Sequence, residues 1–521
     1  MSSKYQYFKT DIIAGLVVAL VAIPLCLGIA AASGASLFSG MISGIIGGIV
    51  IGTLSRSGLS VSGPAAGLIT IVATSIASFG FPTVALAILI AGIFQILLGI
   101  VKAGGIAYYI PSTVIEGMLT AIGITIVLTN LPTMLGLAKI PTPHGLMGYG
   151  FYIWAMITNL VQGGANHIAL GIGVLALAVL IFWGKIKVKS LKLIPGAVMA
   201  VIVGLVGYVV FQRHDTVVFN PAELVQLPII SEAKSFHDVI NFPDFSQILN
   251  PNVWVLAFTI TMVASVETLL TIGATDKIDP LKRITPTNRE LFAQGVGNAL
   301  SGLFGGLPIT SVIVRSRAGL DAGGRTKMTT ITHGTLLFLG VLLIPKFLNT
   351  IPMACLGAIL ALTGYNLCNP AFFIKKLRQS KHQWIPFVAT ILAILEFDLL
   401  RGVAIGIMVA IYFILRGNMK FCYTVSRVTI DEKEYIYLMM SEEVSFLKKA
   451  TIMKTLSRLK KNSNVIMDAQ HTVYIDFDVL EIIREFAEET APQKHINLKL
   501  INFKEAYEIP TNKRFRVPRH W

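Results

Sequence analysis

The stretch Ser62-Gly63-Pro64-Ala65-Ala66-Gly67 breaks an apolar run with glycine and proline, and so does Gly305-Gly306-Leu307-Pro308-Ile309-Thr310-Ser311. The two breaks start 305 − 62 = 243 residues apart. Neighbouring apolar runs keep almost the same offset, since those starting near residues 12 and 253 differ by 241 and those near 82 and 325 by 243. The sequence therefore contains two halves in one register, each with an interrupted segment at the same place.

The composition is that of a membrane protein. Of 521 residues, 54% are hydrophobic and 14% are charged, against roughly 25% charged in soluble domains. Runs of about 20 apolar residues, long enough to cross a bilayer, start near residues 12, 37, 63, 82, 111, 165, 193, 253, 286, 309, 325, 352, 384 and 401. Each half has an odd number of spans, so the second half enters from the opposite side. We predict an α-helical polytopic membrane protein with about 14 transmembrane segments in a 7+7 inverted repeat.

Charged loops give the orientation. Basic clusters at residues 185–192 and 375–381 each follow an even-numbered span, whereas the connection 213–252 is acidic and follows span 7. By the positive-inside rule, both termini are expected on the cytoplasmic side of an inner membrane. The first run lacks a leader cleavage site and is counted as span 1. Because these clusters account for the net charge of +15, that charge does not indicate nucleic-acid binding.

The two breaks are the predicted binding region. In inverted-repeat transporters, paired interrupted segments place half-helix N-termini near the midplane, where free N–H groups attract an anion. The alternative is that glycine and proline only allow close helix packing. Arg315, about one turn after the second break, would add positive potential to an anion site.

Glu267 lies near the middle of span 8, where a carboxylate costs roughly 2.5 to 3.5 kcal/mol. Thr271 shares its helix face, and Ser265 and Thr268 add nearby hydroxyls. Such a group suits a coupling cation, either Na⁺ held by oxygens or a proton on the carboxylate. The alternative is a structural brace in which Glu267 pairs with Arg315 or hydrogen-bonds to a broken backbone.

The sequence shows no pattern of an enzyme. It lacks the phosphate-binding GxxxxGK[ST] motif and a nucleophile elbow, and its histidines and four cysteines have no metal-ligand spacing. We expect no resident metal or cofactor other than Na⁺ as a coupling ion.

After Gly417 the composition becomes charged and alternating. Strand-like runs at 434–440, 464–468 and 496–503 alternate with helix-like runs at 451–459 and 478–489. We predict a transmembrane transport domain over residues 1–418 and a small cytoplasmic α/β domain over residues 431–521.

The chain resembles the sulfate permease (SulP) family of anion transporters. The residues that carry the resemblance are the Asp11 to Pro24 opening, Leu59-Ser60-Val61-Ser62-Gly63-Pro64, Val266-Glu267-Thr268-Leu269-Leu270, Asn288-Arg289-Glu290-Leu291-Phe292-Ala293-Gln294-Gly295 and Phe304-Gly305-Gly306-Leu307-Pro308. The tail resembles the family's STAS domain (sulfate transporter and anti-sigma antagonist).

The resemblance implies a fold like that of uracil permeases, with a core of spans 1–4 and 8–11 that moves against a gate of spans 5–7 and 12–14. It also implies a homodimer. The site residues that it carries over are Pro24, Ala65, Ala66, Thr310, Ser311 and Arg315 for the substrate, with Glu267 and Thr271 for the coupling ion.

Two positions depart from the family pattern. Leu25 stands where many members have a glutamine after the span-1 proline, and Ile475-Asp476 is followed by Phe477 rather than by the phosphorylatable serine of anti-sigma antagonists. The first departure leaves the substrate open, and the second argues against a phosphoserine switch there.

The sequence thus favours a secondary transporter that carries bicarbonate or sulfate inward with Na⁺ or H⁺ by an elevator-like cycle. Two alternatives stay open. One is an uncoupled anion channel or exchanger on the same fold. The other is a membrane-anchored signalling module that acts through the tail and a cytoplasmic regulator.

Overall fold

The computed structural model describes residues 7–137, 140, 145–164, 166–183, 195–213, 223–229, 240–397, 399–419, 423–430, 433–505 and 507. The basic cluster at 185–192 lies outside these residues. The described chain forms two compact units that divide between Ile407 and Met408, and each is described by itself.

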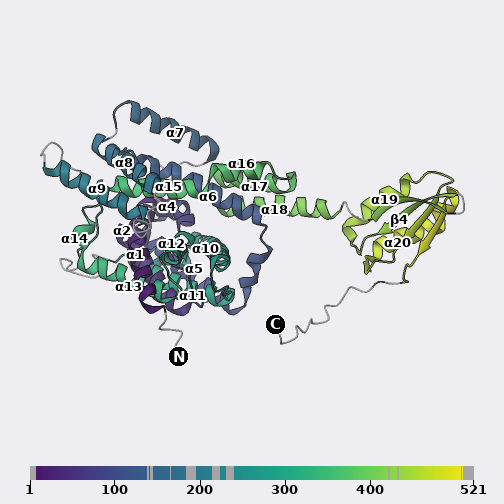
Figure 1. The fold of residues 1–521 in the computed structure, drawn as a ribbon, viewed down its shortest axis with the longest axis horizontal. Helices are drawn as coiled ribbons and strands as arrows, with labels where there is room; N and C mark the ends of the chain where they lie inside the picture. The colour runs from purple at the N-terminus through teal and green to yellow at the C-terminus, as the bar shows by residue number, and fades with distance from the viewer. Residues whose placement is uncertain are drawn as a thin grey trace. The chain divides into compact units, whose positions relative to one another are not determined.

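The first unit is helical (Figure 1). Its first half contains α1 (Phe8–Ala32), α2 (Leu37–Ile46), α3 (Gly52–Leu54), α4 (Ile69–Phe79), α5 (Phe81–Ile100), α6 (Ser112–Met134), α7 (Gly145–Val161), α8 (His167–Trp183) and α9 (Gly196–Arg213). A π-helical turn over Gly47–Ile51 joins α2 to α3.

The second half contains α10 (Pro251–Ile278), α11 (Thr287–Leu303), α12 (Ile313–Asp321), α13 (Met328–Leu343), α14 (Pro345–Leu348), α15 (Met353–Leu367), α16 (Pro370–Leu377), α17 (Lys381–Glu396) and the start of α18 (Leu399–Asn418), a helix that contains the division between the two units. In the described part of the chain, seven helical segments are long and apolar enough to cross a membrane, and four shorter apolar helices accompany them.

Each predicted span start lies close to the start of one of these helices, but α7 was not predicted. Its first turns contain Gly145, Gly148 and Gly150, and glycine is a poor helix former. The fourteen predicted runs therefore missed a helix between spans 5 and 6.

The two interrupted segments meet in space. Ser62–Pro64 forms strand β1 and Ile309–Ser311 forms strand β2, and they pair antiparallel with Ser62 opposite Ser311 and Pro64 opposite Ile309. Each strand leads into a short helix, α4 of 11 residues and α12 of 9 residues. At 1.5 Å per residue neither helix can cross a bilayer of about 30 Å. Both therefore begin inside the unit, as predicted for half-helices.

Close packing around the strands depends on glycine. α11 lies along α5, and a Cβ added to Gly92 would lie 2.2 Å from the backbone nitrogen of Ala299. A Cβ on Gly295 would lie 2.5 Å from the backbone nitrogen of Ile96. Small residues let membrane helices approach this closely, and here they bring α11 and α5 together. Figure 1 shows α5, α10, α11 and α12 gathered in one region of this unit.

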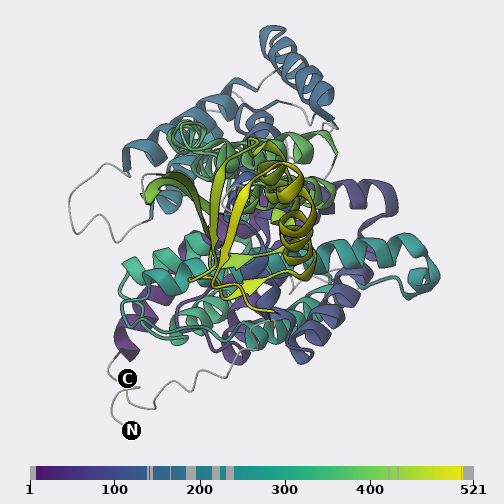
Figure 2. The ribbon, with the colours of Figure 1, turned by 90° about the vertical axis from the view of Figure 1, so that its right-hand side faces the viewer.

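The second unit is an α/β domain. Its four-stranded sheet has the order β3 (Tyr423–Ile430), β4 (Lys433–Met440), β6 (Asn464–Asp468) and β8 (Asn497–Ile501), with β3 antiparallel to β4 and the other pairs parallel. The strands β5 (Glu443–Val444) and β7 (Tyr474–Ile475) pair separately. Helices α19 (Lys449–Arg458), α20 (Phe477–Glu485) and α21 (Ala491–Gln493) complete it. Figure 2 shows its helices along one side of the sheet, and residues such as Leu438, Ile452, Val465 and Ile483 form a shared core.

Candidate anion site

The pairing of β1 and β2 fixes the starts of both half-helices. The backbone N–H of Ala65 donates to the Pro308 carbonyl at 3.0 Å, and that of Val312 donates to the Val61 carbonyl at 2.9 Å. Ala65, Thr310 and Ser311 are all buried. Three of the predicted substrate residues thus lie on or directly beside the paired strands β1 and β2.

Glu267 on α10 lies beside the paired strands β1 and β2. Its Oε2 would be 2.9 Å from a Cβ on Gly67, in the turn before α4, and its carboxyl is also close to the Thr310 hydroxyl. Both Oε2 and the Thr310 Oγ are buried, and within the described chain neither meets a partner at hydrogen-bond geometry. Next to them, Thr268 Oγ accepts from the Ser311 N–H at 3.3 Å. A half-buried glutamate whose Oε2 is buried therefore lies at the junction of the two breaks.

Arg315 is fully buried in the first turn of α12. A Cβ on Gly63 would lie 2.0 Å from its Nη1, so the guanidinium rests directly on the Gly63 backbone. Cys26 of α1 lies beside the guanidinium, and His333 of α13 is close enough to interact electrostatically with it. None of its three nitrogens has a hydrogen-bond partner among the described residues.

The alternative of a Glu267–Arg315 brace is not found. In the described structure both the Glu267 Oε2 and the whole Arg315 guanidinium are without a partner. The alternative that the glycines only allow close packing is not separate from the functional interpretation. Gly63 makes room for the Arg315 guanidinium and Gly67 makes room for the Glu267 carboxylate, so close packing at these glycines also positions the two charged groups.

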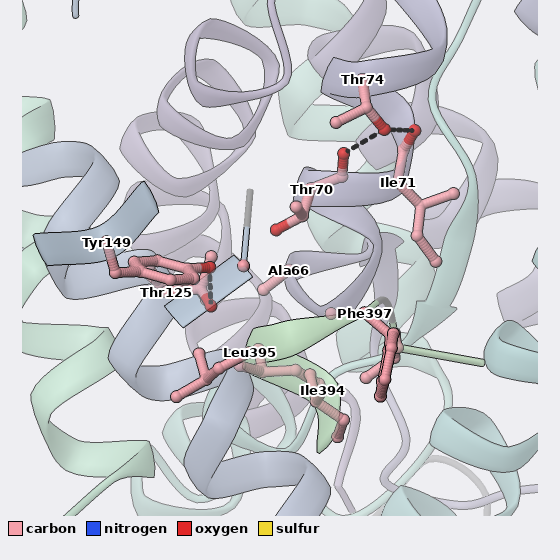
Figure 3. Close-up of a pocket in the computed structure, with 14 residues that line it drawn as sticks. Ala66, Thr70, Ile71, Thr74, Thr125, Tyr149, Ile394, Leu395 and Phe397 are labelled. Atoms are coloured by element: carbon pink, nitrogen blue, oxygen red, sulfur yellow. Dashed lines mark hydrogen bonds between the residues drawn. The ribbon is translucent and has the colours of Figure 1, made fainter. Parts of the chain in front are cut away.

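A cavity of about 180 Å³ opens beside the first break. Ala66, Gly67 and Thr70 line one side, and Thr125 of α6 and Tyr149 of α7 line another (Figure 3). The Tyr149 and Thr125 hydroxyls are 3.1 Å apart. Ile394 and Leu395 of α17, with Phe397 in the turn to α18, close the cavity. Its polar groups are neutral hydroxyls that can donate to an anion.

The cavity contains only part of the predicted site. Among the predicted site residues, Ala66 lines it. The remaining ones do not: Pro24 is buried inside α1, Thr271 is half-buried on α10, and the others that lie outside the lining are Ala65, Glu267, Thr310, Ser311 and Arg315. The sequence interpretation missed Thr70, Thr125 and Tyr149. Thr70 lies four residues after Ala66, a helical spacing that points to one face. Tyr149 lies on the helix that was not predicted.

Two further acidic residues outside the predicted site have specific partners. Glu116 of α6 pairs with Lys376 of α16. Glu396, an exposed residue at the end of α17, accepts from the Leu146 N–H at 2.9 Å at the start of α7. Its neighbour Asp398 lies outside the described residues. Glu396 thus holds α7, which carries Tyr149, against the end of α17.

Comparisons with known proteins agree on one family. The chain is 28% identical to the putative sulfate transporter YvdB of Bacillus subtilis, over 79% of this chain and 74% of the relative. It is also 28% identical to the bicarbonate transporter BicA of a Picosynechococcus species, over 78% of this chain and 70% of that relative.

Among solved structures, murine Slc26a9, an anion transporter in the inward-facing state, superposes with a TM-score of 0.76 at 17% identity, covering 96% of this chain and 86% of that one. The shared fold includes the C-terminal region, whose α/β structure is consistent with a STAS domain. This confirms the predicted class of polytopic membrane protein with a C-terminal α/β domain.

The model of the sulfate permease family matches residues 8–390, most of the chain. Membership in a transporter family also confirms the expectation that the chain is not an enzyme. The protein therefore belongs to the sulfate permease family of membrane anion transporters.

Proposed function

We propose that this protein is a secondary active transporter that carries bicarbonate or sulfate with Na⁺ or H⁺. The observation that carries the proposal is the buried Arg315 guanidinium, which has no partner among the described residues. A buried charge left without a partner is strongly unfavourable. An anion bound beside Gly63 would supply the missing counter-charge.

The two half-helices support the same site. The first-turn N–H groups of a helix carry partial positive charge and favour an anion. Because β1 and β2 are antiparallel, α4 follows the end of β1 that lies opposite Ile309, and α12 follows the end of β2 that lies opposite Ser62. The N-termini of the two half-helices therefore approach the strand pair from opposite ends, and both favour an anion there. We assign Pro24, Ala65, Ala66, Thr310, Ser311 and Arg315 to substrate binding.

Coupling is assigned to Glu267 and Thr271. The Glu267 carboxyl lies beside Thr310 and Gly67 at the same strand pair. A cation at Glu267, either Na⁺ or a proton, would offset the carboxylate while the anion offsets Arg315. Loading both ions would then neutralise both buried charges before the site moves through the membrane, which is the physical basis of the proposed symport.

The proposed movement is elevator-like. The moving core would be α1 to α5 and α10 to α13, and the gate would contain α6, α8, α9, α15, α17 and α18. The cavity supports this division, because Ala66 and Thr70 come from the core whereas Thr125 and Ile394 come from the gate. Sliding of the core would change which side of the membrane the cavity opens to.

The substrate is proposed as one of two anions because equally similar relatives carry different names, a sulfate transporter and a bicarbonate transporter. We further propose a transport domain over residues 1–418 and a cytoplasmic STAS-like domain over 431–521 that binds a regulator. The protein is proposed to be a homodimer in a bacterial inner membrane, with both termini in the cytoplasm.

The test is uptake into liposomes that contain the purified protein. Labelled bicarbonate and labelled sulfate are each offered with an inward Na⁺ gradient, an inward H⁺ gradient, or neither. Saturable uptake of one anion that requires one gradient supports the proposal and identifies both ions. Equal uptake with and without gradients would contradict coupling and favour a channel or exchanger. Absence of uptake of both anions would contradict the substrate assignment.

A further inference from the structure

A chain of buried amide side chains connects the helix that carries Glu267 to the strand that carries Thr310. On α5, Gln95 Nε2 donates to Ser265 Oγ of α10 at 3.2 Å. On α11, Asn298 Nδ2 donates to Gln95 Oε1 at 2.7 Å. Gln95 and Asn298 are fully buried, and Ser265 is 6% exposed. These groups form a continuous polar path through an apolar interior.

The path ends on the backbone of β2. Asn298 Nδ2 also donates to the Ile309 carbonyl at 3.0 Å, and the Ile309 N–H donates to Asn298 Oδ1 at 2.6 Å. Both backbone groups of Ile309 are thus satisfied by one side chain. An irregular strand in a membrane is tolerated only when protein groups satisfy its backbone in this way, so Asn298 takes the place of a third strand.

One end of the path adjoins Glu267, which is assigned to coupling, and the other adjoins Thr310, a proposed substrate residue whose hydroxyl lies beside the Glu267 carboxyl. Ser265 is two residues before Glu267 on α10, and Ile309 directly precedes Thr310. The Glu267 carboxyl and the Thr310 hydroxyl lie close together, but within the described chain neither Oε2 nor Oγ has a hydrogen-bond partner. The positions of α10 and β2, which carry these two groups, therefore decide their spacing.

We propose that Gln95 and Asn298 are positioning residues that hold Glu267 and Thr310 at the spacing that binds the coupling cation. The inference rests on the proposed function, because it assumes that Glu267 takes up a cation. Amides suit this task, since each has both donors and an acceptor and brings no charge of its own. In a low-dielectric interior such fully satisfied networks rigidify their surroundings.

The transport test compares Asn298→Ala, Gln95→Ala and the double variant in liposomes. Loss of a buried hydrogen bond changes an equilibrium by about tenfold. We expect the half-saturating concentration of the driving cation to rise about tenfold in Asn298→Ala, with a smaller rise in the KM for the anion, because β2 carries only some of the residues assigned to the substrate. The double variant should match Asn298→Ala, because both residues belong to one chain.

Asn130→Ala is the matched control. Asn130 is also buried, on α6, and its Nδ2 donates to the Ile126 carbonyl of its own helix at 2.8 Å. It should leave the cation dependence unchanged. Equal shifts of cation and anion dependence in Asn298→Ala, or the same cation shift in Asn130→Ala, would overturn the positioning role.

A second measurement does not depend on transport. Hydrogen–deuterium exchange of the peptide around Ile309 should speed up at least tenfold in Asn298→Ala and stay unchanged in Asn130→Ala. Unchanged exchange in Asn298→Ala would overturn the inference. If wild-type uptake needs no cation gradient but hydrogen–deuterium exchange responds as expected, the coupling proposal fails while Asn298 still positions β2. If wild-type uptake is coupled and Asn298→Ala leaves its cation dependence unchanged, only the inference fails.

Discussion

The Arg315 guanidinium lies directly on the backbone of Gly63, so that a Cβ at position 63 would be 2.0 Å from Nη1. The two residues are 252 positions apart in sequence (315 − 63). They meet because Gly63 on β1 pairs with Thr310 on β2, and Arg315 follows β2 in the first turn of α12. The interrupted segments of the two halves thus form one positively charged site.

Gly63→Ala should therefore disrupt the site. A methyl group there must displace the guanidinium or the strand, and overpacking of this kind costs about 1–3 kcal/mol. We expect anion uptake in liposomes to fall at least about tenfold. Gly105→Ala is the control, because among the described residues other than its chain neighbours none has an atom within 4 Å of a Cβ at Gly105. Similar uptake by both variants would show that the close approach has no functional role.

Glu267→Gln should separate transport from coupling. The amide keeps the shape of the side chain but cannot hold a proton and binds Na⁺ less well than a carboxylate. We expect uptake to lose its dependence on the gradient while slow exchange of anion across the membrane persists. Coupled uptake at the wild-type level in this variant would exclude Glu267 as the coupling residue.

Tyr149→Phe tests the cavity. The substitution removes the hydroxyl that lies 3.1 Å from the Thr125 hydroxyl and leaves the ring in place. A neutral hydrogen bond contributes about 0.5–1.5 kcal/mol, so the KM for the anion should rise about two- to tenfold. Tyr152→Phe, on the same helix but not lining the cavity, should have no effect, and an equal response of the two variants would place the anion path elsewhere.

Glu116→Gln tests the ion pair between α6 and α16. Lys376 is buried, with its side chain 7% exposed, and the Glu116 side chain is 31% exposed. Removing the carboxylate leaves a buried ammonium without its partner, which we expect to cost about 1–3 kcal/mol after partial exposure is considered. The melting temperature in detergent should fall. Asp321→Asn, in the exposed Arg317–Asp321 pair, should change it little, and no difference between the variants would contradict the structural role of the buried pair.

The main outline could be predicted because it depends on one-dimensional patterns. The runs of apolar residues predicted the helices, and the equal offset of the two breaks predicted matching half-helices. The pairing of Ser62 with Ser311 agrees with that prediction.

The structural features that the sequence did not predict depend on contacts between residues far apart in the chain or on weak local patterns. Helix α7 begins with glycines that resemble a loop. Thr70, Thr125 and Tyr149 come from three separate helices, and no spacing in the sequence shows that they line one cavity. Gln95 and Asn298 lie on buried faces of α5 and α11, and their hydrogen bond spans 203 residues.

The most direct test of the account is the concentration dependence of anion uptake by Arg315→Gln. The account predicts that removing the buried positive charge raises the KM at least tenfold, that Arg315→Lys lies between this variant and the wild type, and that Arg317→Gln, at an exposed position, behaves as wild type. A KM for Arg315→Gln equal to that of the wild type, with protein that is folded and inserted, would contradict the claim that Arg315 holds the anion.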